Sequence, residues 1–163
     1  TWAALSSRPL SRPMAASPLA AVEFNVSHSH DVALFGLVLG ADIGVDVERV
    51  RAGLHHDAVT RRFFSPQERA ALEALPPVAR GEAFFRYWTC KEAYLKATGE
   101  GLRRPLSDFE IRFLPEAAPA IYASGAVLPW TLAEIRPVDG YFGAVAVAGL
   151  GYTLSCYQWR IQP

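Results

Sequence analysis

The sequence FFRYWTCKEAYLKATG (84–99) predicts the longest helix of the chain and decides the fold class. This helix is expected to run from about Ala79 to Ala97, with Gly99 as its C-cap. The segments before residue 50 have strand character, and two shorter expected helices lie between them and the long helix. The sequence after the long helix is again rich in strand-forming residues, separated by Pro and Gly. Strands, then helices, then strands predict an α+β fold with an antiparallel sheet.

The other expected elements follow from local patterns. The expected strands are 23–26, 31–40, 42–47, 108–113, 120–122, 130–136, 140–148 and 152–161. The shorter helices are 57–63 and 66–74, and Ser65 and Glu68 have the spacing of a capping box at the start of the second. The Pro- and Ser-rich stretch 5–18 shows no helical or strand period and is expected to be irregular.

The composition narrows the classes of function. The chain has 163 residues, 51% of them hydrophobic, and its 16 basic and 16 acidic residues cancel to zero net charge. That balance argues against a general nucleic-acid binder. The longest apolar runs, 33–41 and 141–150, are too short to cross a bilayer. Two cysteines are too few for a disulfide scaffold and favour a reducing compartment. We therefore expect a cytoplasmic protein without nucleic-acid or membrane partners.

Two carboxylates share one face of the expected strand IGVDVE (43–48). Alternation along a strand places Asp46 and Glu48 together, with Gly44 beside them, where a ligand would approach closely. Two carboxylates one strand period apart favour a cation between them, and Mg²⁺ sites combine one or two carboxylates with water and phosphate. The alternative is a half-buried strand whose polar face meets solvent.

A third carboxylate, Glu92, lies in line with Phe84 and Trp88 on the expected long helix, and Lys91 and Lys96, the chain's two lysines, flank it. A carboxylate on an apolar stripe is costly to bury without a partner. This favours a third metal ligand with two cations placed for phosphate oxygens. The alternative is a surface pair between Glu92 and Lys96, four residues apart.

The segment FNVSHS (24–29) offers several hydrogen-bond donors in a small space, as phosphate binding requires. Ser27 and His28 are the candidates. A Ser–His nucleophile pair is a weaker alternative, because adjacent residues of a strand point to opposite sides and the G-x-S-x-G elbow is missing from the sequence. A polar turn between strands is the other alternative.

Together these pieces resemble the phosphopantetheinyl transferase superfamily, and its larger surfactin-synthetase-activating branch in particular. Four stretches carry the resemblance in the family's order: FNVSHS (24–29), GVDVE (44–48), RFFSPQE (62–68) and FRYWTCKEAYLKATGEGL (85–102). The resemblance implies Mg²⁺-dependent transfer of the 4′-phosphopantetheine arm of coenzyme A to a serine of an apo acyl or peptidyl carrier protein, with release of 3′,5′-ADP.

The resemblance also implies a role for each matching residue. Glu92, or a metal-bound water, would be the base, and Lys96 would stabilise charge on the leaving 3′,5′-ADP. Trp88 would support the site by packing, and Glu68 matches a family position besides its capping role. The remaining roles are Mg²⁺ ligation by Asp46, Glu48 and Glu92, and coenzyme A phosphate binding by Ser27, His28, Lys91 and Lys96.

Members of this branch consist of two similar α/β halves, each an antiparallel sheet with a helix, around a central cleft. The resemblance implies that 1–41 is the remainder of an incomplete first subdomain and that 42–163 is the second. Arg12, followed by Pro13, would be the trace of an upstream phosphate-binding motif. The protein is expected to act as a monomer. Two alternatives stay open: a non-catalytic fragment or pseudoenzyme that binds coenzyme A or a carrier protein, and an Mg²⁺-dependent phosphohydrolase.

Overall fold

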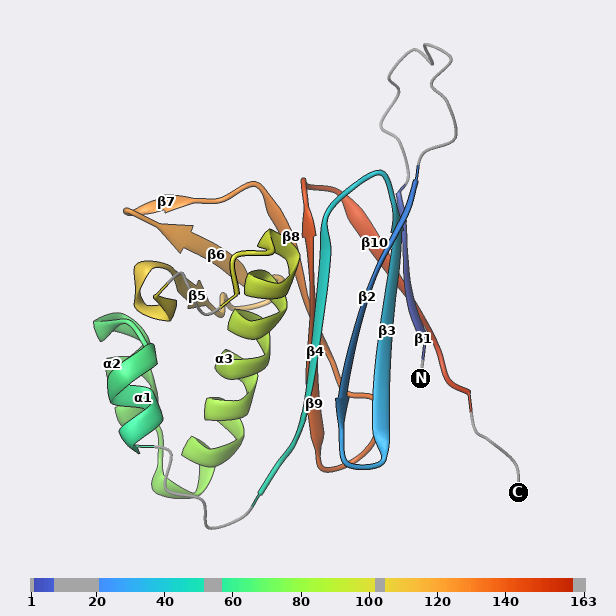
Figure 1. Ribbon diagram of the computed structural model, residues 1–163. Coiled ribbons are helices and arrows are strands. Elements are labelled where there is room, and N and C mark those ends of the chain that lie inside the picture. Colours follow the sequence, from blue (N-terminus) through green and yellow to red (C-terminus); the bar gives the residue numbers. More distant parts are fainter. Residues whose placement is uncertain (1, 8–20, 52–56, 102–104, 160–163) are drawn as a thin grey trace.

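The computed structural model describes residues 2–7, 21–51, 57–101 and 105–159, and it confirms the α+β class. A long helix packs on one three-stranded sheet, and the other face of that sheet packs on a four-stranded sheet (Figure 1). The helix is α3 (Pro77–Thr98). The three-stranded sheet has the order β4 (Ile43–Arg49), β9 (Tyr141–Ala148), β8 (Trp130–Ile135). The four-stranded sheet has the order β10 (Tyr152–Tyr157), β1 (Trp2–Ser7), β3 (Val32–Leu39), β2 (Val22–Ser29).

Shorter elements cover the side of α3 that faces away from the two larger sheets (Figure 1). They are helices α1 (Asp57–Phe63) and α2 (Pro66–Glu73), a 3₁₀ turn at Leu106–Asp108, and a small sheet of β5 (Glu110–Arg112), β6 (Ala120–Ala123) and β7 (Ala126–Val127). One hydrophobic core lies between these elements, α3 and the β4–β9–β8 sheet, and a second core fills the space between the two larger sheets.

Strand β4 separates the two cores, and its side chains alternate as the sequence predicts. Val45 and Val47 belong to the core between the sheets, whereas Gly44 and Asp46 face α3. The expectation that Gly44 admits a ligand is wrong. A Cβ atom there would overlap the backbone of Ala93 and Ala97 in α3, so the missing side chain makes room for the helix itself.

Both predicted helix ends are confirmed. Gly99 ends α3 in the left-handed region at φ 69°, where glycine is favoured. Helix α2 begins with a complete capping box, because the Ser65 hydroxyl accepts a hydrogen bond from the Glu68 N–H and Glu68 accepts one from the Ser65 N–H at 2.8 Å. Among the described residues, none of the helices is long and apolar enough to cross a membrane.

The beginning of the chain differs in part from the expected irregular segment. Residues 5–7 lie in β1, which pairs antiparallel with β10 and parallel with β3. Pairing with two partners imposes this strand, which the local sequence pattern does not indicate. Strands from both sides of the expected subdomain boundary at residues 41 and 42 therefore share one sheet, and the division into subdomains stays a prediction.

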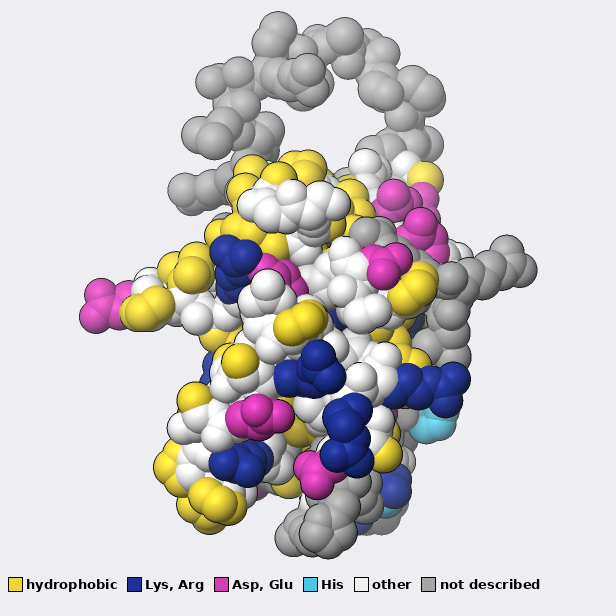
Figure 2. All heavy atoms as spheres, turned by 90° about the vertical axis from the view of Figure 1, so that its left-hand side faces the viewer, with side chains coloured by type: hydrophobic (Ala, Val, Ile, Leu, Met, Phe, Trp, Pro, Cys, Tyr) yellow, Lys and Arg dark blue, Asp and Glu magenta, His cyan; other side chains and the backbone are white. Residues whose placement is uncertain are grey.

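Charged side chains are mixed on the face formed by the helices. In Figure 2, basic side chains on this face are interspersed with acidic and uncharged ones. The exposed arginines of the helices include Arg61 and Arg62 of α1 and Arg80 of α3. This face is therefore not a continuous basic surface of the kind that follows a nucleic-acid backbone.

Candidate functional site

A cavity of about 500 Å³ opens where β2, β4, α1 and α3 meet. Strand β2 contributes Ser27 and His28, strand β4 contributes two carboxylates, and α3 contributes a carboxylate and an ammonium. The residues that line the cavity are Val26, Ser27, His28, Asp46, Glu48, Phe63, Trp88, Glu92 and Lys96. The structure thus brings together most of the site residues that the sequence predicted from three separate motifs.

Lys96 connects the helix to both strands. Its ammonium donates hydrogen bonds to Asp46 Oδ1 at 2.8 Å, to Ser27 Oγ at 3.0 Å and to the Val45 carbonyl at 3.1 Å. These three bonds use all three donors of the group. Lys96 therefore forms its ion pair with Asp46, and the alternative of a helix-surface pair with Glu92 is not what the structure shows.

The three carboxylates of the cavity influence each other electrostatically. Burial raises the pKa of Asp46, and the nearby charge of Lys96 acts in the opposite direction. Burial and then the charge of Asp46 raise the pKa of Glu48. Burial and then the charges of Asp46 and Glu48 raise the pKa of Glu92. The Asp46 charge therefore makes ionisation of Glu48 and Glu92 less favourable, and a bound cation would relieve this repulsion.

The donor set fits a hard cation that takes few protein ligands. Asp46 Oδ2 is buried and has no hydrogen-bond partner in the described part of the chain. Within the same residues, no three Asp, Glu, His or Cys side chains lie close enough to form a complete metal cage. Mg²⁺ sites often use only one or two carboxylates and complete their shell with water and substrate phosphate. One or two of the carboxylates Asp46, Glu48 and Glu92 could hold such an ion.

Lys91 is placed outside this site, which corrects the expectation that it contacts phosphate oxygens. Its side chain is 0% exposed, and its ammonium donates to the carbonyls of Leu106 and Phe109 at 2.7 Å each and to Glu68 at 2.9 Å. All three donors are used inside the core. Glu68 in turn accepts a hydrogen bond from the Ile111 N–H at 2.8 Å. The Lys91–Glu68 pair therefore binds the backbone of the segment 106–111, which follows α3, to the helices.

The helical spacing could have indicated this buried pair. Phe84, Tyr87, Lys91 and Tyr94 follow one helical stripe, and all four are buried. A lysine in such a stripe requires a carboxylate partner. Burial lowers the pKa of Lys91 and raises the pKa of Glu68, and the attraction between the two charges opposes both effects.

Aromatic packing supports the opposite wall of the cavity. The Trp88 ring stacks on Phe84 with centroids 5.9 Å apart and meets the edge of Phe63 at 6.0 Å. These contacts hold the helical turn that carries Glu92 against α1.

The remaining predicted ligand, Arg12, lies outside the described residues.

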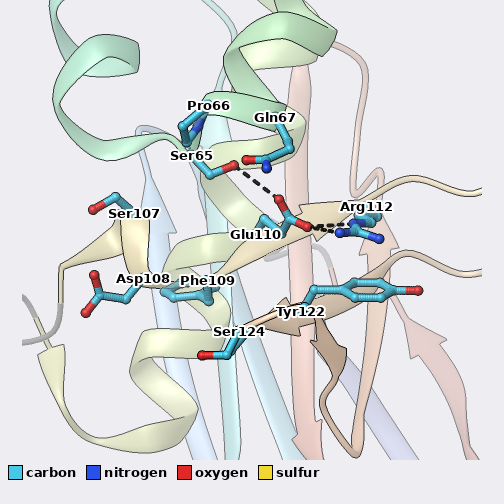
Figure 3. Close-up of a pocket in the computed structure, with 12 residues that line it drawn as sticks. Ser65, Pro66, Gln67, Ser107, Asp108, Phe109, Glu110, Arg112, Tyr122 and Ser124 are labelled. Carbon is cyan, nitrogen blue, oxygen red and sulfur yellow. Dashed lines mark hydrogen bonds and ion pairs between the residues drawn. The ribbon is translucent and has the colours of Figure 1, made fainter.

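A second cavity, of about 220 Å³, lies between the start of α2 and strands β5 and β6 (Figure 3). Its central carboxylate, Glu110, forms an ion pair with Arg112 and accepts a hydrogen bond from Ser65 at 3.4 Å. The Arg112 guanidinium lies over the Tyr122 ring, 3.9 Å from its centroid. Glu110 and Arg112 already pair with each other, and Asp108 is exposed. The larger cavity, in which three carboxylates and an ammonium converge, is therefore the better candidate for a functional site.

Comparisons with known proteins agree with this arrangement. The 4′-phosphopantetheinyl transferase superfamily matches residues 42–146. The 4′-phosphopantetheinyl transferase HetI of Nostoc sp. is 42% identical over 129 residues, which cover 79% of this chain and 53% of the relative. A 4′-phosphopantetheinyl transferase of Bacillus subtilis is 35% identical over 91 residues, covering 56% and 39% respectively. The chain thus spans about half the length of these curated relatives, or less.

Solved structures show the same fold. The crystal structure of a holo-(acyl-carrier-protein) synthase from Bacillus anthracis in complex with CoA (3′,5′-ADP) has a TM-score of 0.56 at 24% identity, covering 65% of this chain and 93% of that chain. The holo-[acyl-carrier-protein] synthase of Thermotoga maritima has a TM-score of 0.54 at 20% identity, covering 66% and 62%. The family match includes β4, α3 and most of β9, the elements that build the central layers. The chain belongs to the 4′-phosphopantetheinyl transferase superfamily.

Proposed function

We propose that this protein transfers the 4′-phosphopantetheine arm of coenzyme A to a serine hydroxyl of an apo acyl or peptidyl carrier protein and releases 3′,5′-ADP. The observation that carries the proposal is the cavity in which Asp46, Glu48, Glu92 and Lys96 converge in a member of this superfamily. A reaction at a phosphorus atom depends mainly on positioning and charge neutralisation, and these side chains supply both.

Each residue of the cavity has a role in this proposal. One or two of the carboxylates Asp46, Glu48 and Glu92 would hold Mg²⁺, which neutralises charge on the coenzyme A pyrophosphate when bound. His28, which is exposed at the cavity, would bind a coenzyme A phosphate oxygen. Ser27 is 7% exposed and donates its one hydroxyl hydrogen to Asp46, so it would have to give up that bond to reach a phosphate oxygen. The Lys96 side chain is 31% exposed at the cavity, so its ammonium can bind a phosphate oxygen in exchange for one of its present bonds. It would stabilise the negative charge on the leaving 3′,5′-ADP.

Glu92 is the candidate base for the carrier serine. The serine oxygen forms a bond to the phosphorus that bears the pantetheine arm, the bond from that phosphorus to the 3′,5′-ADP oxygen breaks, and the hydroxyl proton passes to Glu92. Burial raises the pKa of Glu92, and this makes it a better proton acceptor than an ordinary carboxylate.

We also propose that the protein works as a cytosolic monomer. Cys90 is buried and Cys156 is exposed, and both are free thiols. Free thiols suit a reducing compartment.

Intact-mass measurement of an apo carrier protein after incubation with this chain, coenzyme A and Mg²⁺ tests the proposal. The expected result is a gain of one phosphopantetheine, which EDTA prevents. Asp46→Ala should show no gain, whereas Asp42→Ala, an exposed acidic residue just before β4, should behave as the unchanged chain. Release of free phosphopantetheine without carrier modification would instead indicate a phosphohydrolase.

A second candidate function uses the same cavity for binding alone. In this candidate the chain binds coenzyme A or a carrier protein without transferring the arm. Calorimetry of coenzyme A binding, together with the intact-mass assay, separates the two candidates. Coenzyme A binding without a gain in carrier mass supports the non-catalytic candidate. A gain in carrier mass excludes it.

A further inference from the structure

Strand β4 lies at the edge of its sheet, and side chains of β2 cover the backbone N–H groups on its open side. Three alternate residues of β2 accept these hydrogen bonds, each twenty positions before the donor. The bonds run from Val45 N–H to Asn25 Oδ1 at 3.0 Å, from Val47 N–H to Ser27 Oγ at 3.3 Å, and from Arg49 N–H to Ser29 Oγ at 3.2 Å. This side-chain ladder replaces the missing neighbour strand.

The two serines of the side-chain ladder also donate a hydrogen bond, each to a carboxylate of β4. The Ser27 hydroxyl donates to Asp46 Oδ1 at 3.0 Å, and the Ser29 hydroxyl donates to Glu48 Oε2 at 3.1 Å. Each serine thus accepts from one N–H of β4 and donates to the carboxylate of the preceding residue. The first rung, at Asn25, has no such carboxylate, because the corresponding residue is Gly44, which lies against α3.

The chemistry of a hydroxyl makes this arrangement directional. A serine has one O–H hydrogen and two lone pairs, so accepting the backbone N–H leaves its hydrogen for the carboxylate. Ser29 is 8% exposed, which limits competition from water. His30 Nδ1 is the other polar contact of this hydroxyl, at the longer distance of 3.4 Å. The bond from Ser29 restricts the flexible Glu48 side chain to one orientation.

We propose that Ser29 is a positioning residue, which holds Glu48 at the cavity in the way that Ser27 holds Asp46. This role rests on the proposed function, in which Glu48 binds a divalent cation with the coenzyme A phosphates. Hydrogen-bond partners of metal-binding carboxylates fix the orientation of the ligand, and their removal lowers metal affinity by about 10- to 100-fold. Ser29 needs no contact with the substrate for this role.

The test compares Ser29→Ala with Ser29→Thr and with Ser155→Ala. Threonine keeps the hydroxyl and suits a strand, and Ser155 lies in β10 of the same sheet, outside the residues that line the cavity. Mn²⁺ binding in the presence of coenzyme A is measured by calorimetry, and exchange of the Arg49 amide hydrogen by NMR. Ser29→Ala should bind Mn²⁺ about tenfold more weakly and exchange the Arg49 amide about tenfold faster. Ser29→Thr should restore both values.

The outcomes separate this role from the proposed function. Equal Mn²⁺ affinity in Ser29→Ala and Ser155→Ala would overturn the positioning role, even if Arg49 exchange is faster, because the bond to β4 would then be purely structural. A chain that binds no Mn²⁺ with coenzyme A would also overturn it. If the unchanged chain binds Mn²⁺ but modifies no carrier, the proposed transfer fails, while the contrast among the serine variants still decides the role of Ser29.

Discussion

The Asp46 carboxylate lies 2.8 Å from the Lys96 ammonium, and this ion pair joins β4 to α3 across the mouth of the cavity. Asp46 is 4% exposed, whereas the Lys96 side chain is 31% exposed. The carboxylate is therefore anchored and the cation faces the cavity. Burial nevertheless raises the pKa of Asp46, so the attraction of Lys96 does not fully compensate the lost hydration. This residual cost is what a second cation at Asp46 Oδ2 would reduce.

Asp46→Asn should abolish carrier modification while the fold persists. The substitution keeps the volume and removes a charge that is costly to bury, so we expect the free energy of unfolding to change by only about 1 kcal/mol. Transfer should fall by at least roughly 100-fold, because a charged cation ligand is lost. Urea unfolding and the intact-mass assay measure the two effects. Normal transfer by Asp46→Asn would contradict the metal assignment.

Lys96→Met should slow transfer by about 100-fold, because among the described residues no other lysine or arginine lines the cavity. The variant also leaves Asp46 without its cation, which should lower stability by about 1 kcal/mol for a pair that is partly exposed to solvent. A double-mutant cycle with Asp46→Asn separates the effects: the stability losses should not add, since either change removes the same pair. An unchanged transfer rate in Lys96→Met would make the pair merely structural.

The local patterns predicted the elements well because most of them follow from short-range chemistry. The apolar alternation of β4, the Ser65–Glu68 capping box and the Gly99 C-cap are each specified within a few residues, and the structure has all three. Strand periodicity also placed Asp46 and Glu48 on one face of β4. That β2, β4 and α3 contribute to one cavity depends on how distant segments meet, and only the family resemblance implied it.

The features that the sequence did not reveal depend on tertiary contacts. Gly44 faces α3 rather than a ligand, and Lys91 pairs with Glu68 in the core rather than with phosphate. The outcome for Gly44 requires knowing that α3 packs on β4. For Lys91 the helical stripe could indicate burial, but not that the partner is Glu68. Ser29 was one of several polar residues in a short strand, and its role became visible only when β2 and β4 were placed side by side.

Lys91→Met should destabilise the protein severely, which distinguishes Lys91 from Lys96. The change leaves the Glu68 charge buried without its cation and removes the bonds to Leu106 and Phe109. Breaking one side of a buried ion pair costs about 3–5 kcal/mol. Urea unfolding measures the loss, and the double variant Glu68→Gln with Lys91→Met should recover part of it. A stable Lys91→Met protein with selectively weakened coenzyme A binding would restore the phosphate role.

Gly44→Ala should destabilise the protein by at least about 1–3 kcal/mol, because the added methyl group overlaps the backbone of α3 at Ala93 and Ala97. Gly81→Ala is the matched control. A Cβ atom at Gly81, inside α3, meets no atom within 4 Å, so this variant should gain roughly 0.5–1 kcal/mol from helix propensity. Thermal unfolding of the two variants should shift in opposite directions. If Gly81→Ala were also destabilised, the loss in Gly44→Ala could not be attributed to the overlap of its methyl group with α3.

Glu92→Gln should change how stability depends on pH. The pKa of Glu92 is raised above its ordinary value of 4.5 by burial and by the charges of Asp46 and Glu48, so the folded state holds this proton more tightly than the unfolded state does. Between the unfolded and the folded pKa the native state binds more protons, and stability therefore falls as the pH rises through this interval. Glutamine does not ionise and escapes this loss. Relative to the unchanged chain, Glu92→Gln should therefore be more stable at pH 8 than at pH 4.

Urea unfolding at these two pH values measures the difference, and Glu82→Gln, exposed on the same helix, is the control variant. An identical pH response in the two variants would mean that Glu92 is not coupled to Asp46 and Glu48. The same variant should lose carrier modification if Glu92 accepts the serine proton, since an amide cannot take it up. Retained modification together with the altered pH dependence would separate the electrostatic role of Glu92 from its role as base.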